Sequence, residues 1–197
     1  MGKFALALAG AVLIVTGNVS IGHAMFKLDC GKPTLVGTPG DDVLIGTPGD
    51  DYIIGNGGND IIKGGDGNDC IFAGDGDDRI EGGNGNDEIV DSGGDNIILG
   101  GDGNDRIGVS GDGTNLIKGG KGDDYIVSEG ESDDRIEGGD GDDSIVDGGG
   151  TDLIRGNKGD DCLFSFNDTS ILKGDEGFDG CTGGASQKSC ETLCSLP

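Results

Sequence analysis

The sequence predicts an all-β repeat protein made of very short strands joined by tight turns. Three observations lead to this prediction: a nine-residue period, an aliphatic residue at one fixed position of nearly every period, and 45 glycines among 197 residues. Glycine is unfavourable inside helices, and one apolar residue in nine cannot form a continuous helical stripe. Strands of about three residues separated by turns of about six residues accommodate the pattern.

The repeat extends from Gly37 to Thr182 as sixteen units, with single extra residues at Val109 and Ser128. Position 8 of the unit is predicted to point inward, because neighbouring residues of a strand face opposite sides. It is occupied by Leu44, Ile53, Ile62, Ile71, Ile80, Ile89, Ile98, Ile107, Ile117, Ile126, Ile136, Ile145, Ile154, Leu163, Leu172 and finally Cys181. Glycine, asparagine and aspartate fill the predicted turns, where positive φ angles must be tolerated.

Composition excludes several classes of function. The chain carries 38 acidic and 13 basic residues, a formal net charge of −25, so nucleic acid is not an expected partner and cations are. Its only histidine is His23, which lies in a predicted leader. We therefore expect neither a histidine-based catalytic triad nor a histidine zinc site.

Residues 1–24 are predicted to be a cleaved signal peptide. Lys3 precedes an apolar stretch at residues 4–15, and Gly22 and Ala24 supply small residues before the expected cleavage point. An uncleaved anchor is the alternative, but the apolar stretch is shorter than the roughly 20 residues that a membrane span needs. We expect a secreted, extracellular protein without a membrane span.

The units GGDGNDCIF, GGNGNDEIV and GGDGDDSIV resemble the nonapeptide of the repeats-in-toxin (RTX) family. The resemblance implies a right-handed parallel β-roll (β-solenoid) of about eight coils with two repeats each, and calcium ions held between successive turns. It places the roll at residues 37–182, between an N-terminal cap at 25–36 and a C-terminal cap at 183–197.

Alternate units differ in their suitability for calcium, which takes six to eight oxygen ligands. Every second unit keeps glycine at positions 1 and 4 and aspartate at position 6, and we call these eight turns the strong row. Their position-1 glycines are Gly46, Gly64, Gly82, Gly100, Gly119, Gly138, Gly156 and Gly174. Their aspartates are Asp51, Asp69, Asp87, Asp105, Asp124, Asp143, Asp161 and Asp179. Eight stacked turns enclose seven gaps, so up to seven ions are expected here.

The other eight turns form the weak row. Their position 1 changes to Ala73, Asp91, Ser110, Glu129, Asp147 and Ser165 after the first two units. Position 6 loses its charge at Asn96, Asn115 and Ser170. The best calcium ligands of this row are predicted to be Asp42, Asp60 and Asp78.

The six cysteines are candidates for disulfides, because export leads to an oxidising compartment. Cys30 is close enough in sequence to fold back onto the second coil, which makes a Cys30–Cys70 bridge plausible. The other four are expected to form two bridges that fasten the C-terminal cap, with their pairing left open: Cys162, Cys181, Cys190 and Cys194.

The predicted function is that of a secreted calcium-binding β-roll whose folding is coupled to calcium binding, acting as a structural or interaction module and not as an enzyme. An extracellular protein or polysaccharide could dock on the apolar outer positions Ile54, Phe72, Val90, Val127, Val146 and Phe164. The alternatives are an accessory module of a polysaccharide-acting enzyme, such an enzyme by itself, or an ice-binding solenoid. Acidic, glycine-rich composition is also typical of disordered chains, but the aliphatic column argues against disorder.

Overall fold

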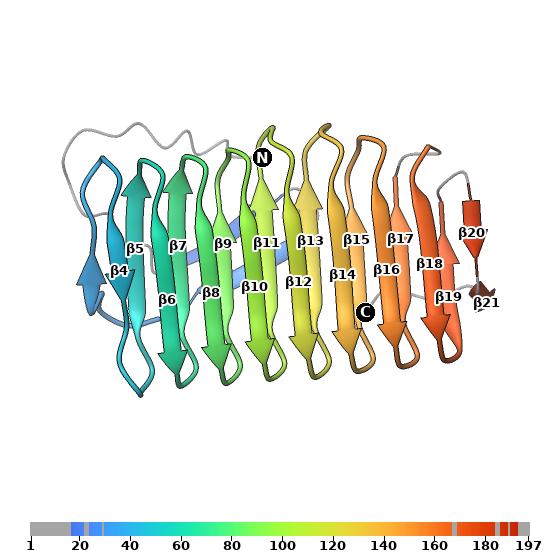
Figure 1. Cartoon of the computed structure of the whole chain (residues 1–197), viewed down its shortest axis with the longest axis horizontal. Coiled ribbons are helices and arrows are strands. Elements are labelled where there is room, and N and C mark those ends of the chain that lie inside the picture. Colours follow the sequence, from blue (N-terminus) through green and yellow to red (C-terminus); the bar gives the residue numbers. More distant parts are fainter. Residues whose placement is uncertain are drawn as a thin grey trace.

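The computed structural model describes residues 17–21, 24–28, 30–166, 169–183, 186–188 and 190–192. Within this part every regular element is a strand, and most strands belong to two long parallel sheets (Figure 1). The chain alternates between the sheets, so two successive strands make one coil of a solenoid of about eight turns. The predicted all-β parallel solenoid is thereby confirmed.

Sheet I contains β4 (Val43–Ile45), β6 (Ile61–Asp66), β8 (Arg79–Asn84), β10 (Ile97–Asp102), β12 (Leu116–Lys121), β14 (Arg135–Asp140), β16 (Leu153–Lys158), β18 (Ile171–Glu176) and β20 (Ser186–Lys188). Sheet II contains β3 (Leu35–Val36), β5 (Tyr52–Gly57), β7 (Cys70–Asp75), β9 (Glu88–Asp91), β11 (Arg106–Ser110), β13 (Tyr125–Glu129), β15 (Ser144–Asp147), β17 (Cys162–Ser165), β19 (Asp179–Thr182) and β21 (Cys190–Thr192). A separate antiparallel hairpin consists of β1 (Gly17–Ile21) and β2 (Ala24–Leu28).

The strand register follows the repeat. Ile53 pairs with Ile71 in sheet II, and Ile62 pairs with Ile80 in sheet I, so one coil takes 18 residues. Where the sequence has an extra residue the coil takes 19, as in the pairing of Ile98 with Ile117. Each position of the nonapeptide therefore stacks on the same position of the next coil.

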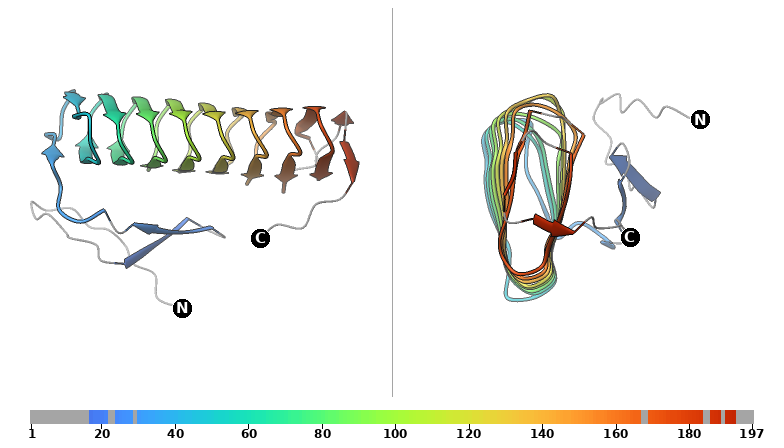
Figure 2. Two further views of the ribbon diagram at one scale, coloured as in Figure 1. Left: turned by 90° about the horizontal axis from the view of Figure 1, so that it is seen from below. Right: turned by 90° about the vertical axis from the view of Figure 1, so that its right-hand side faces the viewer.

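The core is the column of position-8 residues, as predicted. All of them are buried, from Leu44 at 6% exposure to Cys181 at 2%, and the isoleucines between them are fully covered. Seen along its axis the solenoid is a flattened tube, and the two sheets form its long sides (Figure 2). One inward side chain per repeat is enough to fill such a thin interior.

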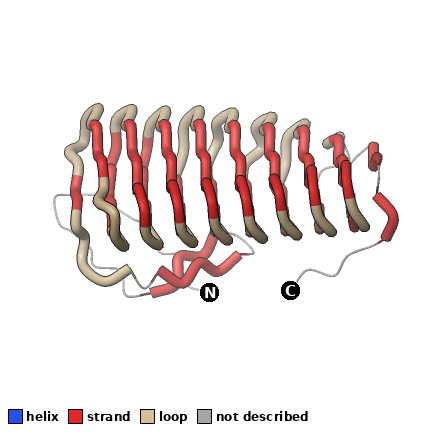
Figure 3. The backbone as a smooth tube through the Cα atoms, turned by 60° about the horizontal axis from the view of Figure 1, so that its bottom comes forward, coloured by secondary structure: helices blue, strands red, loops and turns tan. Residues whose placement is uncertain are grey.

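Turns lie along the two narrow edges of the tube (Figure 3). Strong-row turns lead from sheet I to sheet II, as from β6 to β7, and weak-row turns lead back, as from β5 to β6. In Figure 1 the strong-row turns form the even lower edge, while the upper edge is irregular. The difference between the two rows of the sequence is thus a difference between the two edges of one rod.

The start of the roll is fastened by the predicted disulfide between Cys30 and Cys70, whose Cα atoms lie 5.9 Å apart. Cys162 and Cys181 each take part in a disulfide bond as well. At the other end β20 and β21 extend the two sheets. The pairing predicted for Cys194 lies outside the described residues.

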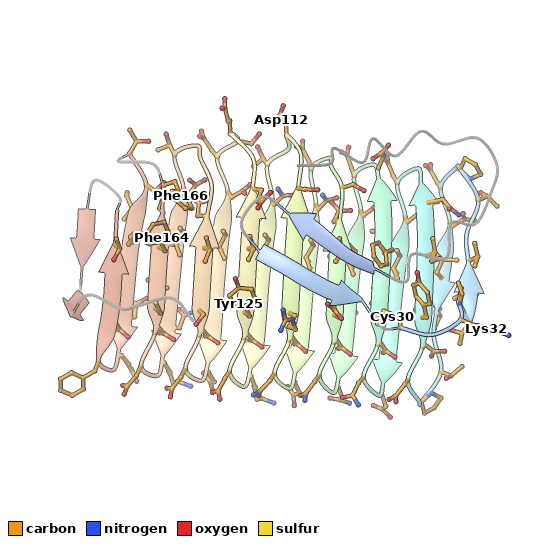
Figure 4. All side chains as sticks on the ribbon, turned by 180° about the vertical axis from the view of Figure 1, so that it is seen from behind. Cys30, Lys32, Asp112, Tyr125, Phe164 and Phe166 are labelled. Carbon is orange, nitrogen blue, oxygen red and sulfur yellow. A yellow bond between two sulfur atoms is a disulfide. The ribbon has the colours of Figure 1, made fainter. Side chains whose placement is uncertain are left out.

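The outer face of sheet II carries the predicted apolar stripe. Its members Val90, Val127 and Val146 are buried, and the β1–β2 hairpin lies across this face beside β11 (Figure 4). Most of the predicted signal peptide, residues 1–16 and 22–23, lies outside the described residues, and its cleavage stays a prediction. No helix among the described residues has the length and apolarity of a membrane span.

Candidate metal centres

A ladder of aspartates extends along the strong row. From Asp51 to Asp161, the backbone N–H of each position-6 aspartate donates to the Oδ1 atom of the position-6 aspartate one coil further on. The N···O distances lie between 2.8 Å, for Asp51 to Asp69, and 3.0 Å, for Asp161 to Asp179. The stacking of the coils thereby fixes the orientation of every carboxylate in this row.

The second oxygen of these carboxylates, Oδ2, has no hydrogen-bond partner. In the strong row this holds for Asp69, Asp87, Asp105, Asp124, Asp143, Asp161 and Asp179, and in the weak row for Asp60 and Asp78. All nine side chains are at most 2% exposed. A buried carboxylate oxygen without a donor is costly, so each of these atoms requires a proton or a cation.

Glycine at position 1 leaves open the space that the free Oδ2 atom faces. A Cβ atom added to Gly64, Gly100 or Gly119 would overlap the Oδ2 atom of the aspartate in the same turn. That Cβ atom would also lie close to the position-1 carbonyl oxygen of the next coil, at 2.5 Å for Gly64 and 2.7 Å for Gly119. The carboxylate and this carbonyl therefore converge on the same small space.

Position-4 glycines complete the arrangement. Gly122 has a φ of 108°, which favours glycine, and a Cβ atom there would overlap the carbonyl oxygen of Gly103 in the preceding coil. Backbone and carboxylate oxygens therefore line the space between successive turns. Such an all-oxygen donor set fits a hard cation such as calcium, which tolerates irregular geometry.

The electrostatics of the row are those of closely stacked anions. Burial raises the pKa of Asp105 and Asp143 to about 8, of Asp87 and Asp161 to about 7, and of Asp124 to about 6. Hydrogen bonds from backbone N–H groups act in the opposite direction but do not outweigh burial. Without a cation these carboxyl groups would take up protons near neutral pH.

Acidification is expected to favour the metal-free fold. An aspartate with a pKa of 3.8 when unfolded and of about 6 to 8 when folded binds more protons in the fold, so its contribution to stability is complete below 3.8. That contribution is lost as the pH rises through 6 to 8. In excess chelator, far-UV circular dichroism should show more strand at about pH 5 than at about pH 8. An equally disordered spectrum at both pH values would contradict this, and a calcium-loaded sample supplies the folded reference.

The first turn of each row differs from those that follow. Thr47 donates its backbone N–H and its hydroxyl to Asp51 Oδ2 at 2.5 Å and 2.9 Å, and Thr38 does the same for Asp42. The hydrogen bonds from Thr47 hold the pKa of Asp51 below its ordinary value. Two predicted ligands, Asp42 and Asp51, therefore already accept hydrogen bonds from protein donors. The sequence feature that indicates this difference is threonine in place of glycine at position 2 of the first two units.

Further along the weak row, protein side chains occupy the space that glycine leaves open elsewhere. Ser128 donates its hydroxyl to Asp134 Oδ2 at 2.5 Å, and Asn96 donates its side-chain amide to Asp91 Oδ2 at the same distance. These side chains supply the hydrogen-bond donor that the strong-row Oδ2 atoms lack. Among the described residues, buried Oδ2 atoms without a donor therefore extend from Asp69 to Asp179 in the strong row but are limited to Asp60 and Asp78 in the weak row.

The two inserted residues sit differently from their predicted places. Val109 pairs with Asp91 and Ser128 pairs with Asp147, and both inserted side chains are buried. They therefore occupy the inward position 1 themselves, and the residues predicted there, Ser110 and Glu129, begin the turns. The strand pairing continues through Val109 and Ser128, so these residues take the inward position. The turn that follows is longer by one residue.

One group of acidic residues was not recognised from the sequence. Asp134, Asp147 and Asp152 each place a carboxylate oxygen within 4.8 Å of the others, and all three are buried. The available signal was an aspartate at both position 1 and position 6 of the unit that begins at Asp147.

The family model of the RTX calcium-binding nonapeptide repeat matches the chain in four copies, over residues 36–71, 72–107, 109–133 and 130–162. The four copies cover more than half of the chain and all of them lie within the two-sheet solenoid. No curated protein matches the sequence as a whole or in part.

Proposed function

The chain belongs to the RTX calcium-binding nonapeptide repeat family, and from this premise we propose that it is a secreted structural or interaction module whose folding depends on calcium. Its repeats form a calcium-binding β-roll. The observation that carries the proposal is the row of buried Oδ2 atoms without donors, each facing a glycine cradle lined by carbonyl oxygens.

In this proposal the strong row holds most of the ions. The ligands are the position-6 carboxylates from Asp69 to Asp179 together with backbone oxygens of the turns above and below. Asp51 is the first aspartate of the row and borders a single gap. Thr47 already donates two hydrogen bonds to its Oδ2 atom, so Asp51 is the weakest ligand of the row. Seven gaps between eight turns allow up to seven ions. In the weak row, Asp60 and Asp78 are the remaining candidates, because their Oδ2 atoms have no donors.

Bound calcium supplies positive charge between carboxylates that would otherwise repel one another. The chain's own residues build the sites for these ions. The ladder of backbone N–H groups orients the carboxylates, and glycine at position 1 keeps the space between turns open. Because the ligands of one gap come from two coils, each ion would join successive turns, and binding would be coupled to folding. Secretion is supported by the Cys30–Cys70 disulfide, which suits an oxidising compartment.

No contact among the described residues favours the enzymatic or the ice-binding alternative, so the non-enzymatic module remains our proposal. Docking of an extracellular protein or polysaccharide also stays a proposal. The valines of the apolar stripe are buried while the hairpin lies over sheet II. Because β1 lies within the predicted signal peptide, cleavage after Ala24 would remove that strand before such a partner could dock.

Calorimetric titration of the full chain with calcium tests the assignment of the strong row. Asp124→Asn is expected to remove one or two ions per chain, because this carboxylate borders two gaps and an amide brings a donor where an acceptor is needed. Asp112→Asn, the same substitution at an exposed position of the weak-row turn in the same coil, is the matched control and should leave the number unchanged. Equal numbers of ions in Asp124→Asn and in the wild type would contradict the proposal.

A further inference from the structure

We propose that Asp134, Asp147 and Asp152 form a separate site for one hard divalent cation on the weak row. One carboxylate oxygen of each residue lies within 4.8 Å of the other two. The three residues are 6%, 1% and 1% exposed, so water cannot screen their charges. Three anions at this spacing in a dry interior require a compensating charge.

The fold brings these carboxylates together from the end of one strand and from two turns. Asp147 ends β15 and lies in the ladder between Ser128 of β13 and Ser165 of β17. Asp134 and Asp152 occupy position 6 of successive weak-row turns, and the N–H of Asp134 donates to Asp152 Oδ1 at 2.7 Å. Asp147 stands at position 1, where a strong-row turn has glycine, so its carboxylate enters the space that position-6 side chains face.

An oxygen without a partner points to a bound ligand. Asp147 Oδ1 accepts no hydrogen bond although the residue is 99% buried. The opposite oxygen, Oδ2, accepts from the hydroxyl of Ser165 at 2.9 Å. Serine hydroxyls also reach Oδ2 of Asp134, from Ser128 at 2.5 Å, and Oδ2 of Asp152, from Ser170 at 2.8 Å. These neutral donors orient the carboxylates but leave the three negative charges in place.

No basic side chain among the described residues forms an ion pair with this cluster. The ion pairs of the roll include Lys63–Glu81, Lys118–Glu137, Lys121–Asp102, Arg135–Glu137 and Lys158–Asp140, none of which involves the cluster. Because the donors are all oxygen, the cation belongs to the hard class that includes calcium, not to the softer class that prefers nitrogen or sulfur ligands.

This site differs in its construction from the glycine turns. Three side-chain carboxylates supply the ligands, whereas a strong-row gap combines a carboxylate with backbone carbonyls. The ligands of this site are not those of the strong row, so different substitutions remove the two kinds of site.

Equilibrium dialysis of the full chain against radioactive Ca²⁺ at neutral pH tests the proposal by counting ions per chain. Asp147→Ser is the informative variant, because serine already occupies the same inward column one coil before and one coil after. We expect this variant to bind one ion fewer than the wild type. Asp133→Asn is the matched control, since it removes a carboxylate from an exposed position of the turn that holds Asp134 while its Oδ1 atom can still accept the N–H of Thr151, and it should lose no ion.

An Asp147→Ser variant that binds as many ions as the wild type would overturn the proposal and assign the compensating charge to a proton shared by Asp147 and Asp152. If circular dichroism in calcium shows that Asp147→Ser does not fold, Asp152→Ser is read in the same way, because Ser170 follows it in its own column. The number of ions bound by the wild type tests the glycine turns of the proposed function. The difference between the wild type and Asp147→Ser tests this cluster, so either proposal can fail without the other.

Discussion

Chelation of calcium at neutral pH is expected to convert the full chain from a compact rod into an expanded, largely disordered polymer. The interior of the roll is one aliphatic column, too thin to offset both the entropy of ordering the repeats and the repulsion within two rows of aspartates. Small-angle scattering should therefore show the radius of gyration rise from below about 20 Å towards about 48 Å, the value expected for an unfolded chain of 197 residues.

Returning calcium in excess of the chelator is the control, and it should restore both the compact scattering curve and the strand signal in circular dichroism. Scattering curves that coincide with and without calcium would contradict the coupling of folding to metal. That result would not contradict the fold. It would mean that the aliphatic column stabilises the roll without calcium.

Periodicity explains why so much of the architecture was predictable. A coil of two nonapeptides places Ile53 on Ile71 and Ile62 on Ile80, so a column in the alignment becomes a column in space. The inward direction of position 8, the alternation between two sheets and the separation of the turns into two rows all follow from that one register. The Cys30–Cys70 bridge was predictable because only a short segment separates Cys30 from the first coils of the roll.

Contacts that depend on which atoms fill one inward space were not predictable. Alignment counts Val109 and Ser128 as insertions, but only the ladder shows that they take the inward slots. Thr47 looks like a neutral replacement for glycine until its hydroxyl is seen on Asp51. Asp147 was assigned to a decayed turn because position 1 and position 6 become neighbours only after the coil closes.

Replacing the position-1 glycine in the middle of the strong row, Gly119→Ala, is expected to lower the stability of the calcium-loaded rod by about 2 kcal/mol, a typical cost of overpacking a tight site. The new methyl group would overlap Asp124 Oδ2 and lie 2.7 Å from the carbonyl oxygen of Gly138. The N–H of Asp105 holds the Asp124 carboxylate through Oδ1, and Gly138 belongs to β14, so neither oxygen can withdraw without unstacking a coil. The melting temperature in calcium should fall by about 4–8 °C.

Gly49→Ala separates this effect from a general intolerance of alanine in the turns. Gly49 lies in the first turn of the same row, and a Cβ atom there would have no other atom within 4 Å. Neither Gly49 nor Gly119 has a positive φ, so backbone strain does not distinguish them. Gly49→Ala should change the stability by less than about 0.5 kcal/mol, as expected for an open surface position. If the two variants melted at the same temperature, the space beside Gly119 would not be the narrow, oxygen-lined gap that the geometry of the strong row describes.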